Sequence, residues 1–307
     1  MKNIWVVCSY FNFNKSLARL NNLNIFRDNI KRYGLKLLCV EFSPLGNFEI
    51  CSNDVDMLLQ LSDGDIMWQK ERLINIGIDL LPHDTNTVII CDADVIFTDD
   101  KFIEKLEITL NKYAAVQCFS SVNHLKQNIN ATNFDYFNVN FNNKDIFINS
   151  SPGCIMTYSL YGNFAAGAAG YIWAFRYEAI KNVKLFESNI IGSGDRVSAS
   201  AFLGLSAPPW VMAGYDRGIY YRYLELAKNN GINRDTVGYI DIPIYDLFHG
   251  LHADRRYNER HNILKNMQFN IEKHLIKQPG APFKFSGYMQ KPHRDEIKNY
   301  FYSRNEM

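Results

Sequence analysis

The sequence has little excess charge and no long apolar segment. Its 33 Lys and Arg residues nearly balance 32 Asp and Glu residues, giving a formal net charge of +1 over 307 residues. Such a chain lacks the composition of a nucleic-acid coat, although a local basic patch is compatible with it. No stretch reaches the roughly 18 uninterrupted apolar residues that a membrane-spanning helix needs, and residues 3–8 begin a strand-like run too early for a signal-peptide core. We therefore expect a cytoplasmic chain without a membrane span.

The six cysteines form no CxxC pair, and several of them lie in apolar runs typical of buried strands. We interpret them as core thiols in a reducing setting. Internal repeats and long linkers are also missing, so one elaborated domain is predicted. Hydrophobic residues make up 47% of the chain, which is enough to bury an α/β core and excludes general disorder.

Strand-like and helix-like segments alternate through the first 120 residues. The pattern predicts strands at 3–8, 35–42, 87–91 and 114–119, and helices at 16–33, 69–81 and 101–113. This βαβ succession is typical of an α/β fold with a mostly parallel central sheet flanked by helices. Ligands are then expected at the carboxyl ends of the strands.

The second half of the chain is less regular. Residues 122–152 are rich in Asn, Phe and Asp without a clean period, and we interpret them as a long loop over an active site, with disorder as the alternative. Beyond them, the pattern predicts a strand at 171–175, a mainly helical stretch at 196–230 interrupted by Pro208-Pro209, a strand at 237–248 and a helix at 257–275.

The segment most informative about chemistry is an apolar strand at 87–91 that ends in Asp92-Ala93-Asp94. Period-two alternation points both carboxylates to the same side. Oxygen ligands placed in this way hold a divalent cation, and a cation that bridges two phosphates suits a transferase with a nucleoside diphosphate leaving group. Two acids after a strand also occur as a helix N-cap pair, so the motif alone does not decide.

A histidine and a further acid follow the predicted strand at 237–248. A neutral imidazole at His249 would complete a mixed Asp/His site for Mn²⁺ or a similar ion, whereas a structural histidine is the alternative. Asp246, three residues earlier, either joins this site or faces water.

Two groups of basic residues are candidates for holding phosphate. The guanidinium groups of the segment Asp254–His261, those of Arg255, Arg256 and Arg260, can clamp a departing diphosphate, or they belong to a solvated helix face. Lys70 and Arg72, at the start of a helical run, are comparable candidates, with surface positions as the alternative.

Asp195 follows Gly192-Ser193-Gly194 and precedes a predicted helix. A carboxylate at such a glycine turn can remove the proton of an acceptor hydroxyl. Plain capping of the helix is the alternative.

The order and spacing of five segments resemble a GT-A fold glycosyltransferase, closest in pattern to the inverting family 2 and family 7 (β-1,4-galactosyltransferase-like) enzymes. The segments are Lys70–Gly77, Cys91–Asp94, Gly170–Phe175, Gly192–Asp195 and Phe248–Gly250. The resemblance spans about residues 1–265 and implies a GT-A, Rossmann-like sheet with a C-terminal acceptor-side subregion. It implies one catalytic domain at 1–280, with a nucleotide-binding half at 1–121, the loop at 122–152 and an acceptor half at 153–280, followed by a tail at 281–307.

By the same resemblance, Asp92 and Asp94 would contact the metal and the nucleotide sugar, with Ala93 between them, and His249 would be the later metal ligand. Asp195 would be the acceptor-side base. The remaining implied donor contacts are Cys8, Ser9 and Tyr10 against the nucleotide base, Lys70 and Arg72 nearby, and Trp173 near the sugar or acceptor.

The function predicted in this way is an inverting, metal-dependent hexosyl or pentosyl transfer. Mn²⁺ or Mg²⁺ would be the cofactor, and a nucleoside-diphosphate sugar, first of all a UDP-sugar, would be the donor. The acceptor would be a glycan or another hydroxyl compound. Hydroxymethylated phage-type DNA is less favoured and would be tracked by a local basic surface of Arg255, Arg256, Arg260, Lys291, His293 and Arg294.

Two other functions compete with this one. A sugar nucleotidyltransferase usually carries a Gly-rich basic loop after its first strand, where this chain has Ser9-Tyr10-Phe11-Asn12. A non-catalytic carbohydrate-binding protein would use the many aromatic residues for stacking and would need no diphosphate site.

Overall fold

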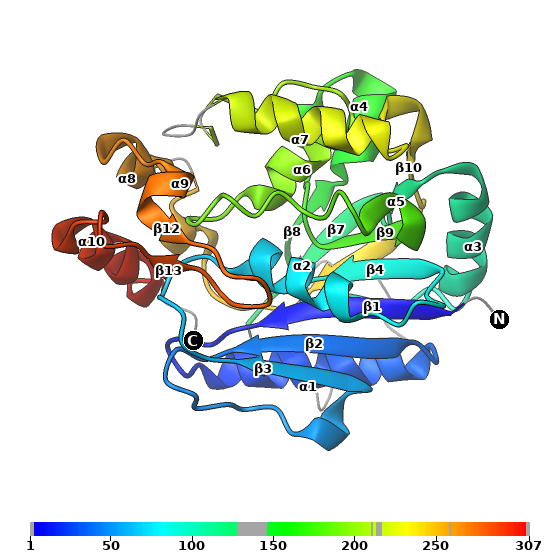
Figure 1. Cartoon of the computed structure of the whole chain (residues 1–307). Helices are drawn as coiled ribbons and strands as arrows, with labels where there is room; N and C mark the ends of the chain where they lie inside the picture. The colour runs from blue at the N-terminus through cyan, green and yellow to red at the C-terminus, as the bar shows by residue number, and fades with distance from the viewer. Residues whose placement is uncertain (1–2, 128–145, 210, 213–216, 258, 305–307) are drawn as a thin grey trace.

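The computed structural model describes residues 3–127, 146–209, 211–212, 217–257 and 259–304. A seven-stranded sheet with the order β10-β6-β9-β4-β1-β2-β3 forms its centre (Figure 1). The strands are β1 (Ile4–Tyr10), β2 (Lys36–Phe42), β3 (Met57–Leu61), β4 (Thr87–Cys91), β6 (Ala115–Gln117), β9 (Ile172–Arg176) and β10 (Val237–Tyr239).

Neighbouring strands of this sheet are parallel, except that β9 runs antiparallel to both β4 and β6. The predicted α/β fold with a mostly parallel central sheet is therefore confirmed. The antiparallel β9 has a consequence for the site, because its first residues lie at the same edge as the carboxyl ends of β1 and β4. Register pairs Cys91 with Ile172 at that edge.

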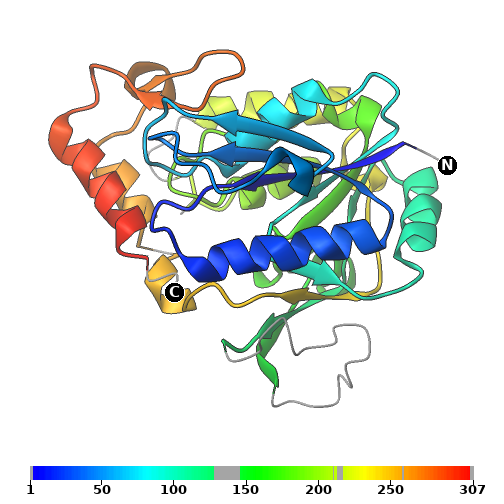
Figure 2. The same ribbon diagram turned by 90° about the horizontal axis from the view of Figure 1, so that it is seen from below.

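Helices cover both faces of the sheet, which explains why β1 and β4 are apolar along almost their whole length. Val6 and Val7, adjacent in β1, belong to two different hydrophobic cores. The core that contains Val6 includes α1 (Leu17–Arg32) and α3 (Phe102–Lys112), whereas α2 (Lys70–Leu80), α6 (Gly194–Phe202) and α7 (Arg217–Asn229) pack in the other. Figures 1 and 2 show α1 on the face of the sheet opposite α2, α6 and α7.

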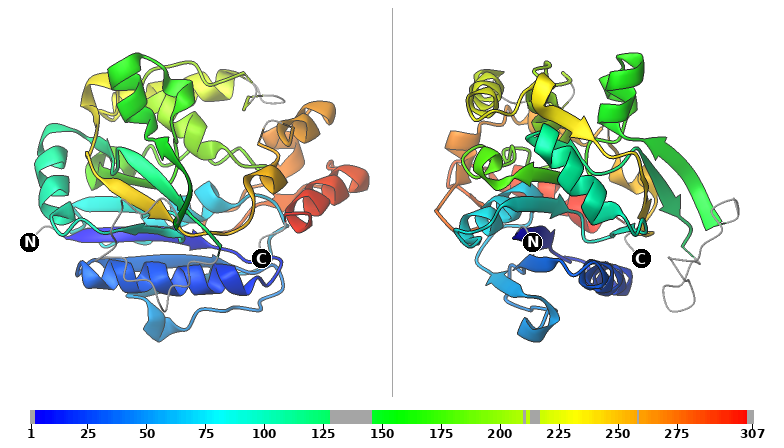
Figure 3. Two further views of the ribbon diagram at one scale, coloured as in Figure 1. Left: turned by 180° about the vertical axis from the view of Figure 1, so that it is seen from behind. Right: turned by 90° about the vertical axis from the view of Figure 1, so that its right-hand side faces the viewer.

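A second sheet continues from the end of β4. Its order is β5-β11-β7-β8, with β5 (Val95–Phe97), β11 (Pro243–Asp246), β7 (Ser121–Leu125) and β8 (Phe147–Pro152). Figures 2 and 3 show β7 and β8 extending away from the body of the molecule. The expectation of a long loop at 122–152 is therefore wrong at both described ends, which are strands, while 128–145 lie outside the described residues.

The predicted strand at 237–248 is divided in two. Gln117 accepts a hydrogen bond from the backbone of Ile240, and Ser120 donates one to Ile242, so the chain passes from the central sheet to the second sheet between these residues. Pro243 then begins β11, a position where a strand tolerates proline. The predicted segment is therefore extended, but it forms two strands, β10 in the central sheet and β11 in the second sheet.

Two predicted helical stretches are also divided. The stretch at 196–230 contains the helices α6 and α7. Helix α6 ends just before Gly204, whose backbone has a left-handed conformation. As far as it is described, the stretch at 257–275 contains the two short helices α8 (His261–Asn266) and α9 (Ile271–His274). They are separated at Gln268, whose φ of 49° is incompatible with a continuous helix.

The segment predicted as a tail, 281–307, packs against the rest of the chain as far as it is described. It contains β13 (Lys284–Phe285), paired with β12 (Leu275–Ile276), and then α10 (Lys291–Tyr302). Ile297, Tyr300 and Phe301 of α10 are buried in the same core as α2 and α6.

The remaining short elements are α4 (Cys154–Tyr161), α5 (Tyr177–Ile180) and the 3₁₀ turns η1 (Ser52–Asp54), η3 (Phe164–Ala166), η4 (Arg234–Thr236) and η5 (His252–Arg255). All six cysteines are free, and all but Cys51 are buried, as expected of core thiols. Of the helices that the structure describes, none combines the length and apolarity required to cross a bilayer.

Candidate active site

A cavity of about 410 Å³ opens at the edge where β1 and β4 end and β9 begins. Residues from distant parts of the chain line it. The predicted site residues among them are Ser9, Tyr10, Lys70, Asp92, Ala93, Asp94, Asp195, His249 and Arg255. The structure therefore brings these predicted site residues together at one edge of the sheet.

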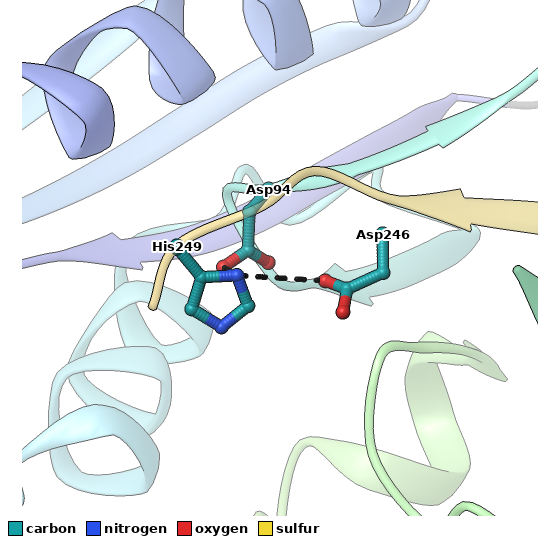
Figure 4. Close-up of side chains that lie close together, drawn as sticks. All are labelled: Asp94, Asp246 and His249. Carbon is teal, nitrogen blue, oxygen red and sulfur yellow. Dashed lines mark ion pairs between the residues drawn. The ribbon is translucent and has the colours of Figure 1, made fainter. Parts of the chain in front are cut away.

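Asp94, Asp246 and His249 gather on one side of this cavity, and each offers a ligand atom within 4.8 Å of those of the other two (Figure 4). The second sheet brings them together. Asp246 pairs with Val95, the residue after Asp94, and the backbone N–H of Leu247 donates to the carbonyl of Asp94 at 2.8 Å. His249 follows two residues later, with its Nδ1 atom 3.3 Å from Oδ2 of Asp94.

His249 is buried, and its ring is oriented by its own backbone. Nδ1 lies 2.7 Å from the carbonyl oxygen of Leu247, and it is also the ring nitrogen that faces the two carboxylates, 3.3 Å from Asp94 Oδ2 and 3.7 Å from Asp246 Oδ1 (Figure 4). Burial lowers the pKa of His249 to about 3, and the nearby Arg255 charge acts in the same direction. The imidazole is therefore neutral, as metal ligation requires.

Asp246 is 4% exposed, so the alternative in which it faces water is wrong. Its Oδ2 atom lies 2.7 Å from Nδ1 of His124, which stands opposite it on β7. The other oxygen, Oδ1, is buried and has no hydrogen-bond partner among the described residues. An unsatisfied buried carboxylate oxygen is costly unless a cation completes its contacts.

These three side chains fit a divalent cation. Two carboxylates and one neutral imidazole form a hard-to-borderline donor set, which suits Mn²⁺ and related ions. The contact from His124 to Asp246 is an outer-shell interaction of the kind that usually orients a metal ligand. A bound cation would also compensate the buried Oδ1 atom of Asp246, which has no hydrogen-bond partner among the described residues.

Asp92 lies in the cavity but outside this group of three. Its Oδ1 atom forms an ion pair with the ammonium group of Lys70 at the start of α2. Burial raises the pKa of Asp92 to about 6, although the Lys70 charge opposes the shift. Burial would lower the pKa of Lys70, but the carboxylates of Asp92, Asp195 and Glu71 together raise it above its usual value.

Glu71, which sequence reasoning did not single out, lies under the same part of the cavity. Its side chain is 2% exposed and accepts a hydrogen bond from Trp68 Nε1 at 2.8 Å. Burial raises the pKa of Glu71 to about 7; the Lys70 charge opposes this shift and the Asp195 charge adds to it. A Cβ added at Gly194 would lie 2.7 Å from Glu71 Oε1, so a glycine is needed there.

Asp195 lies in the first turn of α6, whereas Ser193 occupies the N-cap position. One oxygen of Asp195 accepts the backbone N–H of Arg196 at 2.7 Å. The other, Oδ2, reaches toward the start of β9, where a Cβ added at Gly170 would lie only 2.5 Å from it. Gly170 thus leaves room for a carboxylate that lines the cavity.

The cavity lining also contains several guanidinium groups. They come from α1, from α6, from the segment after β11 and from the chain just after α10, and they are Arg19, Arg196, Arg255, Arg260 and Arg304. Tyr300 of α10 contacts two of these residues: its hydroxyl donates to the backbone carbonyl of Arg255 at 2.9 Å and accepts from Arg260 Nη1 at 3.3 Å. Of these five, the sequence had indicated Arg255 and Arg260 as candidates for holding the diphosphate.

Two predicted donor contacts are core residues. Cys8 is fully buried on the side of β1 opposite Ser9, because alternate residues of a strand face opposite ways. Trp173 is also buried, with its Nε1 donating to the carbonyl of Ala169 at 2.8 Å and its ring stacked on Phe175. Neither residue lines the cavity.

Two predicted phosphate ligands also point elsewhere. Arg72, two residues after Lys70 on α2, is buried and donates to the backbone carbonyls of Ala281 and Gln278. It therefore fixes the C-terminal segment. Arg256 is exposed, outside the cavity lining, and donates to Ser303 Oγ at 3.1 Å.

The basic surface predicted for DNA is not continuous. Arg260 is buried in the cavity wall, and Arg294 donates to the backbone carbonyls of Met289 and Ser286. These arginines are committed to internal contacts, so they do not form an exposed path for a phosphate backbone.

No protein-family model and no curated protein matches the sequence. Similar solved structures include Drosophila β1,4-galactosyltransferase 7 in complex with manganese, UDP-Gal and xylobiose, with 10% identity, 78% of this chain and 65% of that chain covered, and a TM-score of 0.36. Another is S. aureus TarS, with 10% identity, 97% and 42% covered, and a TM-score of 0.40. A third is a putative nucleotide-diphospho-sugar transferase from Desulfovibrio desulfuricans, with 11% identity, 98% and 99% covered, and a TM-score of 0.37.

The match thus spans less than two thirds of the galactosyltransferase and of TarS. TM-scores this low do not assign an activity. The function has to be inferred from the residues of the cavity.

Proposed function

We propose that this chain is a metal-dependent glycosyltransferase that moves a sugar from a nucleoside-diphosphate sugar to an acceptor hydroxyl with inversion. One observation carries the proposal: the carboxylate, carboxylate and imidazole ligands of Asp94, Asp246 and His249 share a cavity with the separate carboxylate of Asp195. An ion-binding group and a free base are the two parts that such a transfer needs.

Asp94, Asp246 and His249 would hold Mn²⁺ or Mg²⁺, which when bound supplies positive charge to a departing diphosphate. In this set Asp246 takes the place of Asp92 in the predicted set of Asp92, Asp94 and His249. Asp92 instead holds the Lys70 ammonium group in the cavity, where it can meet a phosphate oxygen or a sugar hydroxyl.

The donor would lie across the end of β1. Ser9, Tyr10 and Phe11 line the cavity there, and the Tyr10 hydroxyl is fixed by a 2.8 Å hydrogen bond to Glu49. An aromatic surface of this kind suits a nucleotide base. Arg255 lies close enough to His249 for its charge to lower the pKa of that imidazole, and it would contact the diphosphate. A uridine diphosphate sugar is the first donor to test.

Asp195 would accept the proton of the acceptor hydroxyl. Its Oδ2 atom faces the gap left by Gly170, while Oδ1 is occupied by the Arg196 N–H. A direct displacement by that hydroxyl requires one base and no protein nucleophile, and it inverts the configuration of the sugar.

A panel of nucleotide sugars tests the proposal. The purified chain should hydrolyse one of them slowly in the presence of Mn²⁺ or Mg²⁺ and should stop when the metal is chelated. Asp94→Ala should abolish this hydrolysis. Pyrophosphate release from a sugar phosphate and a nucleoside triphosphate would instead identify a nucleotidyltransferase, and metal-independent carbohydrate binding without hydrolysis would identify a binding protein.

A further inference from the structure

Arg260 is a buried cation in the wall of the cavity, with 5% of its surface exposed. Its Nη2 atom donates to Ser193 Oγ at 2.6 Å, and its Nη1 atom lies 3.3 Å from the Tyr300 hydroxyl. The ring of Tyr257 lies under the guanidinium, 4.7 Å away. Nε is buried and has no hydrogen-bond partner among the described residues.

None of these contacts is with an anion. No carboxylate of the described residues forms an ion pair with Arg260, although a buried charge without a counter-ion is strongly disfavoured. A guanidinium cannot escape this cost by deprotonation, because its pKa is too high. A negatively charged ligand in the cavity would offset the cost.

The charge of the lining supports a ligand with more negative charge than the donor alone. The described lining contains six cationic side chains, Arg19, Lys70, Arg196, Arg255, Arg260 and Arg304, and four carboxylates, Asp92, Asp94, Asp195 and Asp246. A divalent cation and a diphosphate with two negative charges cancel each other. The cationic surplus of the lining is then still present.

Arg260 contacts the glycine turn that leads into the proposed base, Asp195. Its guanidinium packs against Gly192, where an added Cβ would lie 3.0 Å from Nη2, and against Ser193, two residues before Asp195. Ser193 Oγ also lies 3.1 Å from His261 Nε2, and burial lowers the pKa of His261 to about 3, so this ring is neutral. If that nitrogen carries the proton, Ser193 accepts from both neighbours and its own hydroxyl hydrogen is available to a ligand.

We propose that Arg260 and Ser193 form a binding site for an oxyanion, a phosphate or a carboxylate, that the acceptor carries near its reactive hydroxyl. The inference rests on the proposed function, because it places the anion beside the base of that reaction. It narrows the acceptor from any hydroxyl compound to an anionic one.

Inorganic phosphate serves as the probe, titrated by calorimetry into protein saturated with UDP and Mg²⁺. Phosphate should bind to the wild-type protein even though UDP occupies the donor site. Arg260→Gln should weaken phosphate binding by about tenfold or more, the effect of losing a charge-assisted contact, while the affinity for UDP changes less than about twofold. Arg256→Gln, an exposed neighbour outside the cavity, is the matched control and should change neither.

Ser193→Ala is a second variant for the same titration, to be used if Arg260→Gln does not fold. It should also weaken phosphate binding. Failure of phosphate to bind to the UDP-saturated wild type would overturn the oxyanion site. An equal loss of UDP binding and phosphate binding in Arg260→Gln would assign Arg260 to the donor diphosphate. Displacement of phosphate by UDP-glucuronate but not by UDP-glucose would assign Arg260 to a carboxylate of the donor sugar. Either result would overturn the acceptor site. Absence of metal-dependent UDP binding by the wild type would contradict the proposed function itself.

Discussion

His124 Nδ1 lies 2.7 Å from Oδ2 of Asp246, and both side chains are buried. The two residues stand opposite each other on β7 and β11, although 122 positions separate them in the chain. This contact leaves Oδ1 of Asp246 directed toward Asp94 and His249. The second sheet therefore determines the orientation of a proposed metal ligand.

Replacing His124 should weaken metal binding without removing a ligand. We expect His124→Gln to raise the dissociation constant for Mn²⁺ by about 10- to 100-fold, as loss of an outer-shell contact generally does. Saturating metal should restore most of the activity. The exposed His83→Gln is the control, and equal metal affinity in the two variants would show that His124 does not orient Asp246.

The proposed base should matter for transfer and little for donor binding. Asp195→Asn retains an oxygen for the Arg196 N–H but cannot take up a proton. We expect the kcat for sugar transfer to fall by about 10²- to 10⁴-fold, with the affinity for UDP and Mg²⁺ nearly unchanged. Transfer at the wild-type rate would exclude Asp195 as the base.

Gly170 should be required for the placement of that base. A methyl group at this position would lie 2.5 Å from Asp195 Oδ2, so Gly170→Ala must displace the carboxylate. The kcat should fall by about tenfold or more, the usual consequence of a misplaced catalytic group. Gly287→Ala, where nothing lies within 4 Å, is the control and should have wild-type kinetics. Identical activity of both variants would contradict the predicted crowding.

Glu71 should make stability depend on pH near neutrality. Burial raises its pKa from 4.5 to about 7, so the folded protein holds this proton more tightly than the unfolded chain does. The corresponding stabilisation is complete below pH 4.5 and is lost as the pH rises through about 7. The free energy of unfolding of the wild type should therefore fall relative to Glu71→Gln over this range, by about 3 kcal/mol at most.

Urea unfolding in the presence of EDTA at pH 5, 6, 7 and 8 measures this difference. Glutamine can still accept the Trp68 N–H, so the variant should fold. The exposed Glu104→Gln is the control and should run parallel to the wild type at every pH. A Glu71→Gln curve that is also parallel would show that Glu71 has an ordinary pKa in the folded protein.

The elements predicted best from sequence are those whose pattern is long and local. The strand expected at 87–91 is β4, and the helix expected at 16–33 is α1 within one residue at each end. Their apolar spacing is determined by burial against immediate neighbours in the fold. Prediction of Asp92 and Asp94 at the edge of the sheet followed from the end of β4.

The second sheet could not be predicted because its strands pair over long distances. β11 lies within the strand predicted at 237–248, but nothing in that pattern shows its partners, and β5 has three residues, too few for a local period to identify. Only their pairing brings Asp246 to Asp94 and His124 to Asp246. The Asp246-x-x-His249 spacing was the available signal, and it could not distinguish a ligand from a surface acid.

Lys70 and Arg72 illustrate a second limit. Helix α2 is buried from Glu71 to Ile78, so its sequence does not show which side faces the cavity. Two residues correspond to about 200° of rotation in a helix, which directs Lys70 toward Asp92 and Arg72 toward the segment after α9. The hydrogen bonds from Arg72 to that segment are accepted by the backbone carbonyls of Ala281 and Gln278, which no pattern of side chains reveals.

The central claim is that Asp94, Asp246 and His249 hold a divalent ion on which a nucleoside diphosphate binds. Calorimetric titration of UDP into the wild type, Asp246→Asn and Asp92→Asn, with Mn²⁺ and with EDTA, tests it most directly. We predict that the wild type binds UDP only with Mn²⁺, that Asp246→Asn loses this binding and that Asp92→Asn keeps the dependence on metal. Undiminished Mn²⁺-dependent UDP binding by Asp246→Asn would contradict the claim.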